Sequence, residues 1–238
     1  MRIDILTIFP KMFDGPFAEG LIAKAIHKRI IRINLVDIRS FSKSKHKKID
    51  DKPFGGVVGM VMSPEPLYDA IKSVGVKKKN NSYKNPYSKP YVVYMSPQGK
   101  RLNNMLVRNL SKFKHLVLLC GRYEGVDERI VNYVDDEISI GDYILTGGEI
   151  PSMVLVDSVA RMLPGVIKKE DSVKNDSFYD GLLDYSHYTR PAIFRGYGVP
   201  KVLLSGDHKK IGEWCTEDSY ERTKKRRPDL LDTEIKKN

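Results

Sequence analysis

The chain has 238 residues, of which 41% are hydrophobic and 30% charged, enough apolar side chains for one large or two modest cores. Lys and Arg number 41 against 30 for Asp and Glu, and the formal net charge of +11 favours a polyanionic partner such as nucleic acid. No stretch approaches the roughly 18 apolar residues of a membrane span, and residues 1–4 lack the apolar run of a signal peptide, so we expect a cytoplasmic protein without membrane contact.

The first two thirds of the chain alternate between short β-branched runs and segments of helical spacing, a pattern typical of βαβ units and a mainly parallel sheet. In chain order we expect a strand at 3–9, a helix around 21–26, strands at 31–38, 91–95 and 116–120, and a helix at 150–163. The runs at 91–95 and 116–120 are apolar throughout, which predicts central strands covered on both faces. The sequence therefore indicates an α/β fold.

Two polar stretches interrupt this pattern. Residues 76–89 have almost no apolar side chains and predict a solvated loop, to which we assign no function. Residues 168–176 are again polar, so we divide the chain into a domain at 1–163, a linker at 164–176 and a small, mainly helical C-terminal domain at 177–238. The last domain is expected to contain a helix from Lys209 onward and a basic run at 222–227.

Three glycine-bearing segments follow predicted strands, at 96–99, 121–125 and 139–148. The carboxyl ends of parallel strands meet at one edge of a sheet, and glycines there let the main chain approach a ligand closely. For any one segment taken alone, a tight turn is the better explanation of its glycine. The three segments together favour a small-molecule pocket.

The sequence lacks the motifs of several common nucleotide and metal sites. There is no GxGxxG, GxxxxGK[ST] or HExxH motif, which argues against ordinary Rossmann, P-loop and zinc-protease sites. The five histidines lack metal-ligand spacing, and the two cysteines, Cys120 and Cys215, form no CxxC, so we predict neither a metal centre nor a disulfide scaffold. Acid and base chemistry is then left to carboxylates, Arg or Tyr.

Five longer motifs together carry a family resemblance. They are SPQG at 96–99, CGRYEGVDER at 120–129, SIGDYILTGGE at 139–149, DSFYDGLLDYSHYTRP at 176–191 and VPKVLLSGDH at 199–208. In this order they resemble the bacterial tRNA (guanine-N1)-methyltransferases of the SPOUT superfamily. The resemblance implies a parallel sheet with a deep trefoil knot, a rare exception to the rule that chains are unknotted, and a homodimer with its active site at the subunit interface.

The resemblance assigns the glycine-bearing segments to S-adenosyl-L-methionine. The residues implied are Tyr94, Met95, Pro97, Gly99, Gly121, Glu124, Ile140, Gly141, Asp142, Tyr143, Ile144, Leu145, Gly147, Gly148 and Pro151. Apolar side chains and main-chain groups of this kind suit an adenine ring. For Glu124 a solvent-facing turn carboxylate is the alternative interpretation. A divalent cation such as Mg²⁺ is compatible with the resemblance, although no site for it is visible in the sequence.

Methylation at N1 of guanine removes a proton from a ring nitrogen while negative charge develops on the neighbouring carbonyl oxygen. The resemblance places a base at Asp176 and a cationic partner at Arg161. Both have structural alternatives, because an Asp can cap a short helix and an Arg near a helix C-terminus interacts favourably with the helix dipole.

The basic clusters then suggest a tRNA interface, since Lys and Arg contacts to phosphates dominate nucleic-acid affinity. The resemblance brings the loop after Asp50 to the substrate guanosine and the C-terminal domain to the anticodon branch, although Val57 and Val58 stand where the family more often has Gly and Pro. The implied RNA-binding residues are Asp50, Ser177, His187, Tyr188, Arg190, Arg222, Lys224 and Arg226. A solvated surface is the alternative for any such basic run.

The function implied is methyl transfer from S-adenosyl-L-methionine to N1 of the guanosine 3′-adjacent to the tRNA anticodon, position 37. Two alternatives stay open at this point. One is a SPOUT methyltransferase acting on another RNA nucleotide, and the other is a non-catalytic RNA-binding relative.

Overall fold

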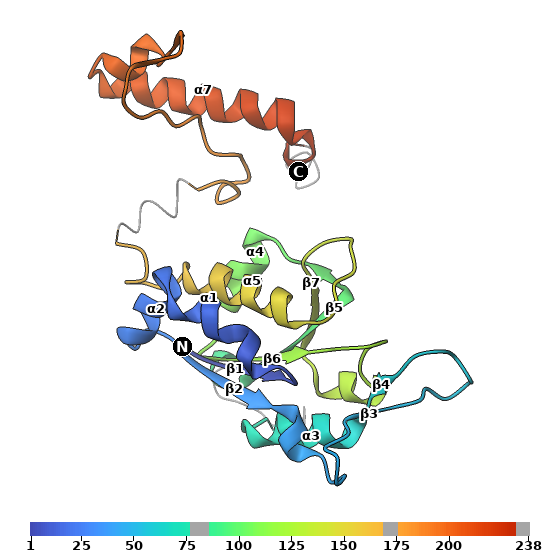
Figure 1. Cartoon of the computed structure of the whole chain (residues 1–238). Helices are drawn as coiled ribbons and strands as arrows, with labels where there is room; N and C mark the ends of the chain where they lie inside the picture. The colour runs from blue at the N-terminus through green and yellow to red at the C-terminus, as the bar shows by residue number, and fades with distance from the viewer. Residues whose placement is uncertain (77–85, 169–175, 232–238) are drawn as a thin grey trace. The chain divides into compact units, whose positions relative to one another are not determined.

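The structure is a computed structural model that describes residues 1–76, 86–168 and 176–231 (Figure 1). The chain divides into two compact units, unit 1 at Met1–Lys168 and unit 2 at Lys169–Asn238. Residues 77–85 of the predicted loop and 169–175 of the predicted linker lie outside the described residues. None of the helices in the described part of the chain is long and apolar enough to span a membrane.

Unit 1 is built on a five-stranded sheet in which every neighbouring pair is parallel, with the order β2-β1-β6-β5-β7. The strands are β1 (Arg2–Thr7), β2 (Arg32–Asp37), β5 (Pro90–Arg101), β6 (His115–Cys120) and β7 (Asp136–Ser139). The predicted α/β fold is confirmed, and β5 and β6 are interior strands, as the apolar runs at 91–95 and 116–120 predicted. A strand before the segment at 139–148 was expected, but its bounds were not predicted; the structure shows it as β7.

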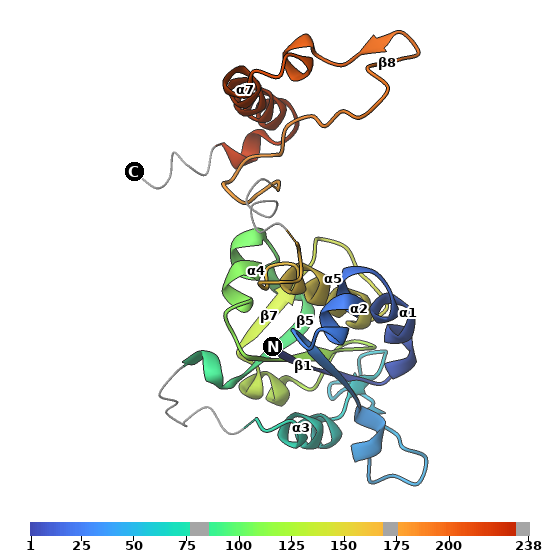
Figure 2. The same cartoon turned by 90° about the vertical axis from the view of Figure 1, so that its left-hand side faces the viewer.

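Helices cover both faces of the sheet (Figures 1 and 2). Alternate strand residues belong to two apolar clusters, with Leu116 and Leu118 in one and Val117 and Leu119 in the other. The first cluster includes side chains of α2 and α5, and the second includes side chains of α3. The helices of unit 1 are α1 (Asp14–Ala18), α2 (Gly20–His27), α3 (Pro64–Ser73), α4 (Asn104–Leu110) and α5 (Glu149–Ala160).

Short elements complete unit 1. Strands β3 (Asp50–Asp51) and β4 (Val61–Met62) pair antiparallel and enclose the loop at 52–60. The 3-10 turns are Pro10–Phe13, Ile38–Phe41, Pro86–Ser88 and Glu128–Tyr133.

The segment 96–99, predicted as a loop, belongs instead to strand β5. Pairing with β7 shifts register between Met95 and Lys100 and then resumes, with Lys100 opposite Ile138 and Arg101 opposite Ser139. Met95 and Lys100 both lie opposite Ile138, so residues 96–99 have no partner in β7 and form a four-residue bulge within the bounds of β5.

The amino end of the sheet is closed by polar contacts around the buried Asp4. Burial alone would raise the pKa of Asp4, but hydrogen bonds from His115, Asn34 and Arg2 outweigh it and hold the pKa below its usual value. The glycine-bearing segments leave from the opposite, carboxyl end of the sheet.

Unit 2 contains the hairpin of β8 (Ile193–Phe194) and β9 (Tyr197–Gly198), the helix α7 (His208–Arg226) and 3-10 turns at Lys201–Leu204 and Pro228–Leu230. The helix predicted from Lys209 onward is therefore confirmed. The described residues of unit 2 contribute no side chain to either apolar cluster, and the one buried side chain of α7 is Thr223.

Candidate cofactor site at the carboxyl end of the sheet

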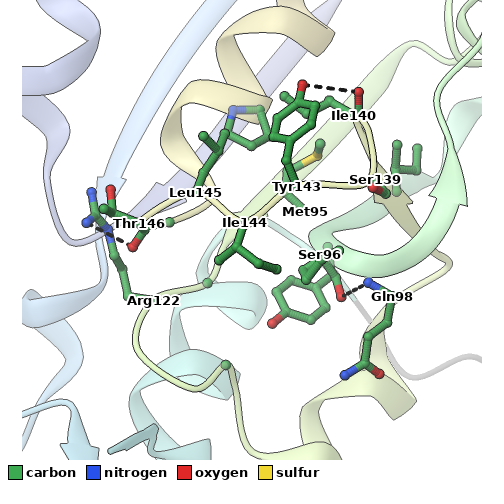
Figure 3. A pocket seen from close by; sticks show the side chains of 18 of the residues that line it. Met95, Ser96, Gln98, Arg122, Ser139, Ile140, Tyr143, Ile144, Leu145 and Thr146 are labelled. Atoms are coloured by element: carbon green, nitrogen blue, oxygen red, sulfur yellow. Dashed lines mark hydrogen bonds between the residues drawn. The ribbon is translucent and has the colours of Figure 1, made fainter.

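A cavity of about 370 Å³ opens where β5, β6 and β7 end (Figure 3). Its volume lies in the range of roughly 300–1,000 Å³ typical of small-molecule pockets. The apolar wall is supplied by Met95, Ile138, Ile140, Leu145 and Pro151. Side chains of this kind can enclose an aromatic base, while the main chain of the glycine-bearing segments offers donors and acceptors.

Two glycines make room for aromatic rings that line this cavity. A Cβ placed on Gly121 would lie 2.8 Å from the Tyr94 ring, and a Cβ on Gly141, which has a φ of 154°, would overlap the Tyr143 ring. A side chain at either position would therefore displace a ring that lines the cavity. The two glycines thus let the rings of Tyr94 and Tyr143 lie close to the main chain of the neighbouring segments.

A buried ion pair joins two of the segments around the cavity. The Arg122 Nε donates a hydrogen bond to the Glu149 carboxylate at 3.0 Å, and Arg122 Nη1 donates to the Thr146 carbonyl at 3.1 Å (Figure 3). Glu149, which is 1% exposed, also accepts a 2.8 Å hydrogen bond from the Thr7 hydroxyl. These contacts fix the cavity wall to strand β1.

Gly147 and Gly148 allow these contacts because glycine has no Cβ. The Gly148 amide donates to the Gly121 carbonyl at 2.9 Å, and a Cβ at Gly148 would lie 2.8 Å from the Cys120 Cα. A Cβ at Gly147 would overlap the Arg122 side chain. The two glycines thus allow the segment at 146–148 to lie against the end of β6.

Two groups beside the cavity are held neutral. Burial raises the pKa of the Tyr94 phenol, and it raises the pKa of the Cys120 thiol still more strongly. Cys120 is fully buried, with its Sγ 3.2 Å from the Ser152 hydroxyl, as expected for an inert strand residue.

The structure brings nearly all the predicted cofactor residues together. Those lining the cavity are Tyr94, Met95, Pro97, Gly121, Glu124, Ile140, Gly141, Tyr143, Ile144, Leu145, Gly147, Gly148 and Pro151. Sequence reasoning did not assign the further lining residues Ser96, Gln98, Arg122, Tyr123, Gly125, Ile138, Ser139 and Thr146. Several of these lie within the motifs and could have been included for that reason alone.

Two predicted cofactor residues, Gly99 and Asp142, are not part of the lining. A Cβ at Gly99 would overlap the backbone of Glu137 and Ile138, so this glycine permits the close passage of β5 and β7. Asp142 is exposed and pairs with Arg101. Neither residue lines the cavity.

Glu124 connects the cavity with the loop at 52–60. The side chain is exposed and lines the cavity, while its amide donates to the Met60 carbonyl at 3.0 Å. A Cβ at Gly59 would lie 2.5 Å from the Glu124 Cγ, so glycine at this position allows the contact. Asp50, at the start of the same loop, is half-buried and pairs with Met62.

The two predicted catalytic residues belong to different units. Arg161 is half-buried at the C-cap of α5 in unit 1. Asp176 lies in unit 2, where its carbonyl accepts the Tyr179 amide in a turn and the residue lines a second cavity of about 420 Å³. Residues 176–181 form no helix, so Asp176 is not the helix cap that the alternative interpretation required.

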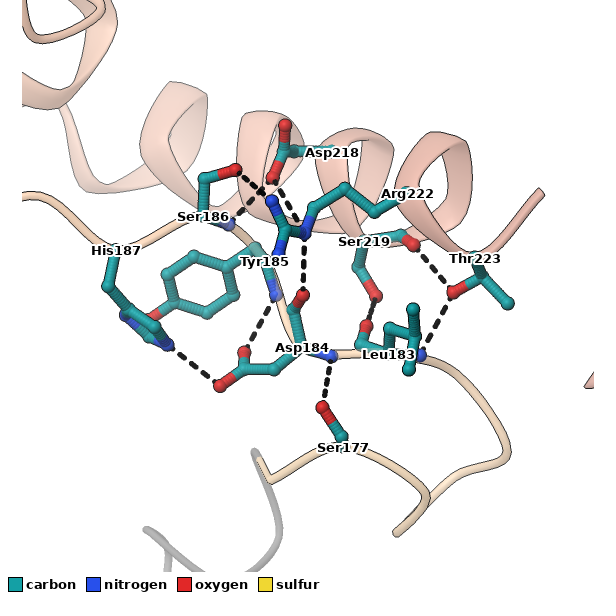
Figure 4. A network of polar contacts seen from close by, with 10 residues as sticks. All are labelled: Ser177, Leu183, Asp184, Tyr185, Ser186, His187, Asp218, Ser219, Arg222 and Thr223. Atoms are coloured by element: carbon teal, nitrogen blue, oxygen red, sulfur yellow. Dashed lines mark hydrogen bonds and ion pairs between the residues drawn. The ribbon is translucent and has the colours of Figure 1, made fainter. Parts of the chain in front are cut away.

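A polar network holds the segment at 183–186, here called the strap, against α7 (Figure 4). Arg222 donates to the Asp184 carbonyl at 3.2 Å and to the Ser186 hydroxyl at 2.8 Å. The Thr223 hydroxyl accepts the Leu183 amide at 2.9 Å and donates to the Ser219 carbonyl at 2.7 Å. The guanidinium of Arg222, a residue predicted to bind RNA, thus makes hydrogen bonds within unit 2.

The other predicted RNA-binding residues divide in a similar way. The Ser177 hydroxyl accepts the Asp184 amide at 2.9 Å and extends the network toward Asp176 (Figure 4). His187 pairs with Asp184 at 2.8 Å, although its side chain stays exposed. The remaining members, Tyr188, Arg190, Lys224 and Arg226, are exposed. Within the described part of the chain, no three His, Cys, Asp or Glu side chains come together to hold a metal ion.

A parallel β-sheet covered by helices, with a glycine-lined cavity of nucleoside size at its carboxyl end, is typical of α/β proteins that bind small molecules. The family model described as tRNA (Guanine-1)-methyltransferase TrmD matches residues 1–233. The chain therefore belongs to this family, and the resemblance given by the sequence motifs is confirmed.

Curated relatives cover almost the whole chain. A protein of Endomicrobium trichonymphae is 72% identical, over 97% of this chain and 99% of its own length. Proteins of Alkaliphilus oremlandii and Ruminiclostridium cellulolyticum are 51% and 49% identical, over 97% and 100% of this chain and 92% and 99% of their own lengths. Each of the three is named tRNA (guanine-N(1)-)-methyltransferase.

Proposed function

We propose that this chain transfers a methyl group from S-adenosyl-L-methionine to N1 of guanosine 37, the nucleotide 3′-adjacent to the anticodon of tRNA. The observation that carries the proposal is the 72% identity, over nearly the full length of both chains, to a tRNA (guanine-N(1)-)-methyltransferase. The net charge of +11 supports a polyanionic substrate. A cytoplasmic location is part of the same proposal.

The cavity fits the proposed cofactor. Its apolar wall suits the adenine, and a side chain at Gly121 or Gly141 would displace a tyrosine ring that lines the cavity. The residues that would hold the cofactor are those that line the cavity, with Ile140, Leu145 and Pro151 on the apolar side. When bound, the cofactor supplies an electrophilic methyl group on a sulfonium sulfur.

The chain's own residues supply the proton chemistry. In the proposed reaction the Asp176 carboxylate accepts the proton from guanine N1 and so leaves a lone pair on N1 as the nucleophile. The bound cofactor would supply the methyl group, and the electron pair of the broken carbon–sulfur bond would stay on its sulfur as a neutral thioether. Arg161 donates a hydrogen bond to the guanine carbonyl oxygen, where negative charge develops as the proton leaves. The Asp184 amide donates a hydrogen bond to the Ser177 hydroxyl, and this contact joins the turn that contains Asp176 to the strap.

A homodimer and a knot belong to this proposal. Ile150 and Val154 form an exposed apolar stripe along α5 that continues to Arg161, and a second subunit would cover that stripe. The proposed knot rests on membership of the family. Sedimentation of the purified protein tests the dimer.

The proposal is tested by methyl transfer from labelled cofactor to two unmodified tRNA transcripts, one with G at position 37 and one with that G replaced. We expect 1-methylguanosine, identified by nucleoside mass spectrometry, in the first transcript alone. Equal transfer to both would move the target to another nucleotide, and no transfer to either would leave a non-catalytic RNA-binding protein.

The base is tested by Asp176→Asn, with Asp180→Asn as the matched control because Asp180 lines the same cavity of unit 2. We expect Asp176→Asn to lose orders of magnitude in methyl transfer while cofactor affinity, measured by calorimetry, stays unchanged. Near-normal turnover in this variant, or an equal loss in Asp180→Asn, would remove Asp176 as the base.

A further inference from the structure

The β8–β9 hairpin in unit 2 has an unusual turn (Figure 2). Phe194 pairs with Tyr197, so Arg195 and Gly196 form a two-residue turn, and their φ angles of 49° and 86° are both positive. Turns of this kind strongly prefer Asn, Asp or Gly, because other side chains are strained at positive φ. The hairpin thus holds an arginine at its tip in a conformation that arginine rarely adopts.

The two faces of the hairpin differ. Residues directly opposite each other in an antiparallel pair share a face, so the Phe194 and Tyr197 rings lie on one side and Ile193 lies on the other, opposite Gly198. Phe194 is 61% exposed, Tyr197 82% and Ile193 70%. The Arg195 guanidinium lies 5.4 Å from the centre of the Phe194 ring, a cation–π distance.

The charge around the hairpin has a single sign. Residues 185–206 contain Arg190, Arg195 and Lys201 and no Asp or Glu. Exposed aromatic rings in a cationic segment suit unpaired nucleotides, because every base has a face that can stack and every phosphate attracts Arg or Lys. A hydrophobic protein partner would gain nothing from this positive charge.

We propose that the β8–β9 hairpin is an RNA-binding element in which the Phe194 and Tyr197 face stacks on an unpaired base of the tRNA and Arg195 contacts an adjacent phosphate. This inference rests on the proposed function, which makes tRNA the substrate. It adds a contact surface to the predicted RNA-binding residues, which do not include the hairpin.

The double variant Phe194→Ala/Tyr197→Ala tests the surface, and Ile193→Ala is its matched control on the opposite face. We expect the double variant to bind unmodified tRNA roughly 5- to 150-fold more weakly, which is the loss of one stacked base. Ile193→Ala should stay within about twofold of the wild type, since it removes exposed apolar surface but no aromatic ring. Cofactor affinity should be the same in all three proteins.

Arg195→Gly separates binding from folding, because glycine is the favoured residue in such a turn. We expect this variant to keep or raise the thermal midpoint while it weakens tRNA binding, and to lower the slope of log Kd against log salt by about 0.7 to 1. A variant that is more stable and yet binds worse cannot be explained by damage to the hairpin.

Three outcomes would overturn the proposal. They are an unchanged tRNA Kd in the double variant, an equal loss in Ile193→Ala, and a change of oligomeric state in the double variant, which would make the face a contact between two copies of the chain. A wild-type protein that binds tRNA through the hairpin but methylates no transcript would contradict the proposed function alone.

Discussion

The two units are held together by different physical means. Unit 1 has two apolar clusters, one on each face of its sheet. The described part of unit 2 has no buried apolar side chain; hydrogen bonds join α7 to the strap, and the Tyr185 and Tyr188 rings contact Trp214 of α7. Burying a large apolar side chain stabilises a fold by about 1.5–3 kcal/mol, while an average hydrogen bond contributes about 0.5–1.5 kcal/mol net. The cavity therefore lies in a rigid unit, and Asp176 lies in a unit of low local stability.

This difference suits the proposed roles, in which unit 1 binds the cofactor and unit 2 binds tRNA. A cofactor cavity with fixed glycine contacts works best on a rigid scaffold, because its shape is then present before the ligand arrives. A segment that must follow a large RNA is better held by polar contacts, which open at lower free energy.

The largest expected effect is a steric one in unit 1. In Gly99→Ala the added Cβ overlaps the backbone of Glu137 and Ile138, which cannot move aside without separating β5 from β7. We expect a loss of about 3 kcal/mol or more in the free energy of unfolding, at the upper end of overpacking effects. Chemical denaturation followed by near-ultraviolet circular dichroism measures it.

Gly15→Ala is the matched control for Gly99→Ala. Gly15 lies in α1, and a Cβ there would meet nothing within 4 Å. Alanine should be neutral or stabilise by about 0.5–1 kcal/mol through its better helix propensity. If Gly99→Ala were as stable as this control, the close passage of β5 and β7 would not be a rigid feature of unit 1.

A smaller loss is expected when the ion pair beside the cavity is broken. Glu149→Gln leaves the Arg122 guanidinium, 15% exposed, without its carboxylate. We expect about 2–3 kcal/mol of destabilisation, below the 3–5 kcal/mol of a fully buried pair, because Arg122 keeps its hydrogen bond to the Thr146 carbonyl. Cofactor affinity, measured by calorimetry, should fall as well, because the cavity wall loses its link to β1.

An exposed pair in unit 2 provides the comparison. Arg227 and Asp229 are joined by two hydrogen bonds of 2.8 and 2.6 Å, and both side chains are exposed. Asp229→Asn should leave the free energy of unfolding and the cofactor affinity unchanged, since surface ion pairs contribute little. Equal losses in the two variants would show that burial does not set the value of the pair at Arg122.

How far the sequence predicts the fold depends on whether the signal is local. The strands at 91–95 and 116–120 were predictable because an interior parallel strand is apolar throughout. The bounds of strand β7 were not, since Asp136–Ser139 is short and mostly polar. The residues 96–99 look like a turn locally, and the structure places them in a bulge of β5 between two stretches that pair with β7.

The same limit applies to the site. Glycine-rich segments after predicted strands indicated the cavity, because glycine lets the main chain approach a ligand or another segment closely. The contacts of Glu149 were not predictable, since Arg122 lies 27 residues away and Thr7 lies 142 residues away. Arg222 stands in a basic run typical of RNA contacts, and only its packing against the strap shows that it is occupied internally.

The smallest expected effect lies in unit 2, at the one buried side chain of α7. Thr223→Val keeps the shape but leaves the Leu183 amide without its acceptor, which costs about 1–3 kcal/mol locally. Hydrogen exchange at the strap should therefore quicken, and the KM for tRNA should rise while cofactor affinity, which depends on unit 1, stays constant. Thr223→Ser retains the hydroxyl and should restore both.

Thr216→Val is the control that isolates the strap contact. Thr216 lies on the same helix, is exposed, and donates its hydroxyl to the Gly212 carbonyl at 3.1 Å, as Thr223 donates to Ser219. This variant loses the local bond within the helix but leaves the Leu183 amide paired, so exchange at the strap should be unchanged. If Thr223→Val behaved like Thr216→Val, the Thr223 hydroxyl would not be what holds the strap, and the other contacts of α7, such as those of Arg222, would be sufficient.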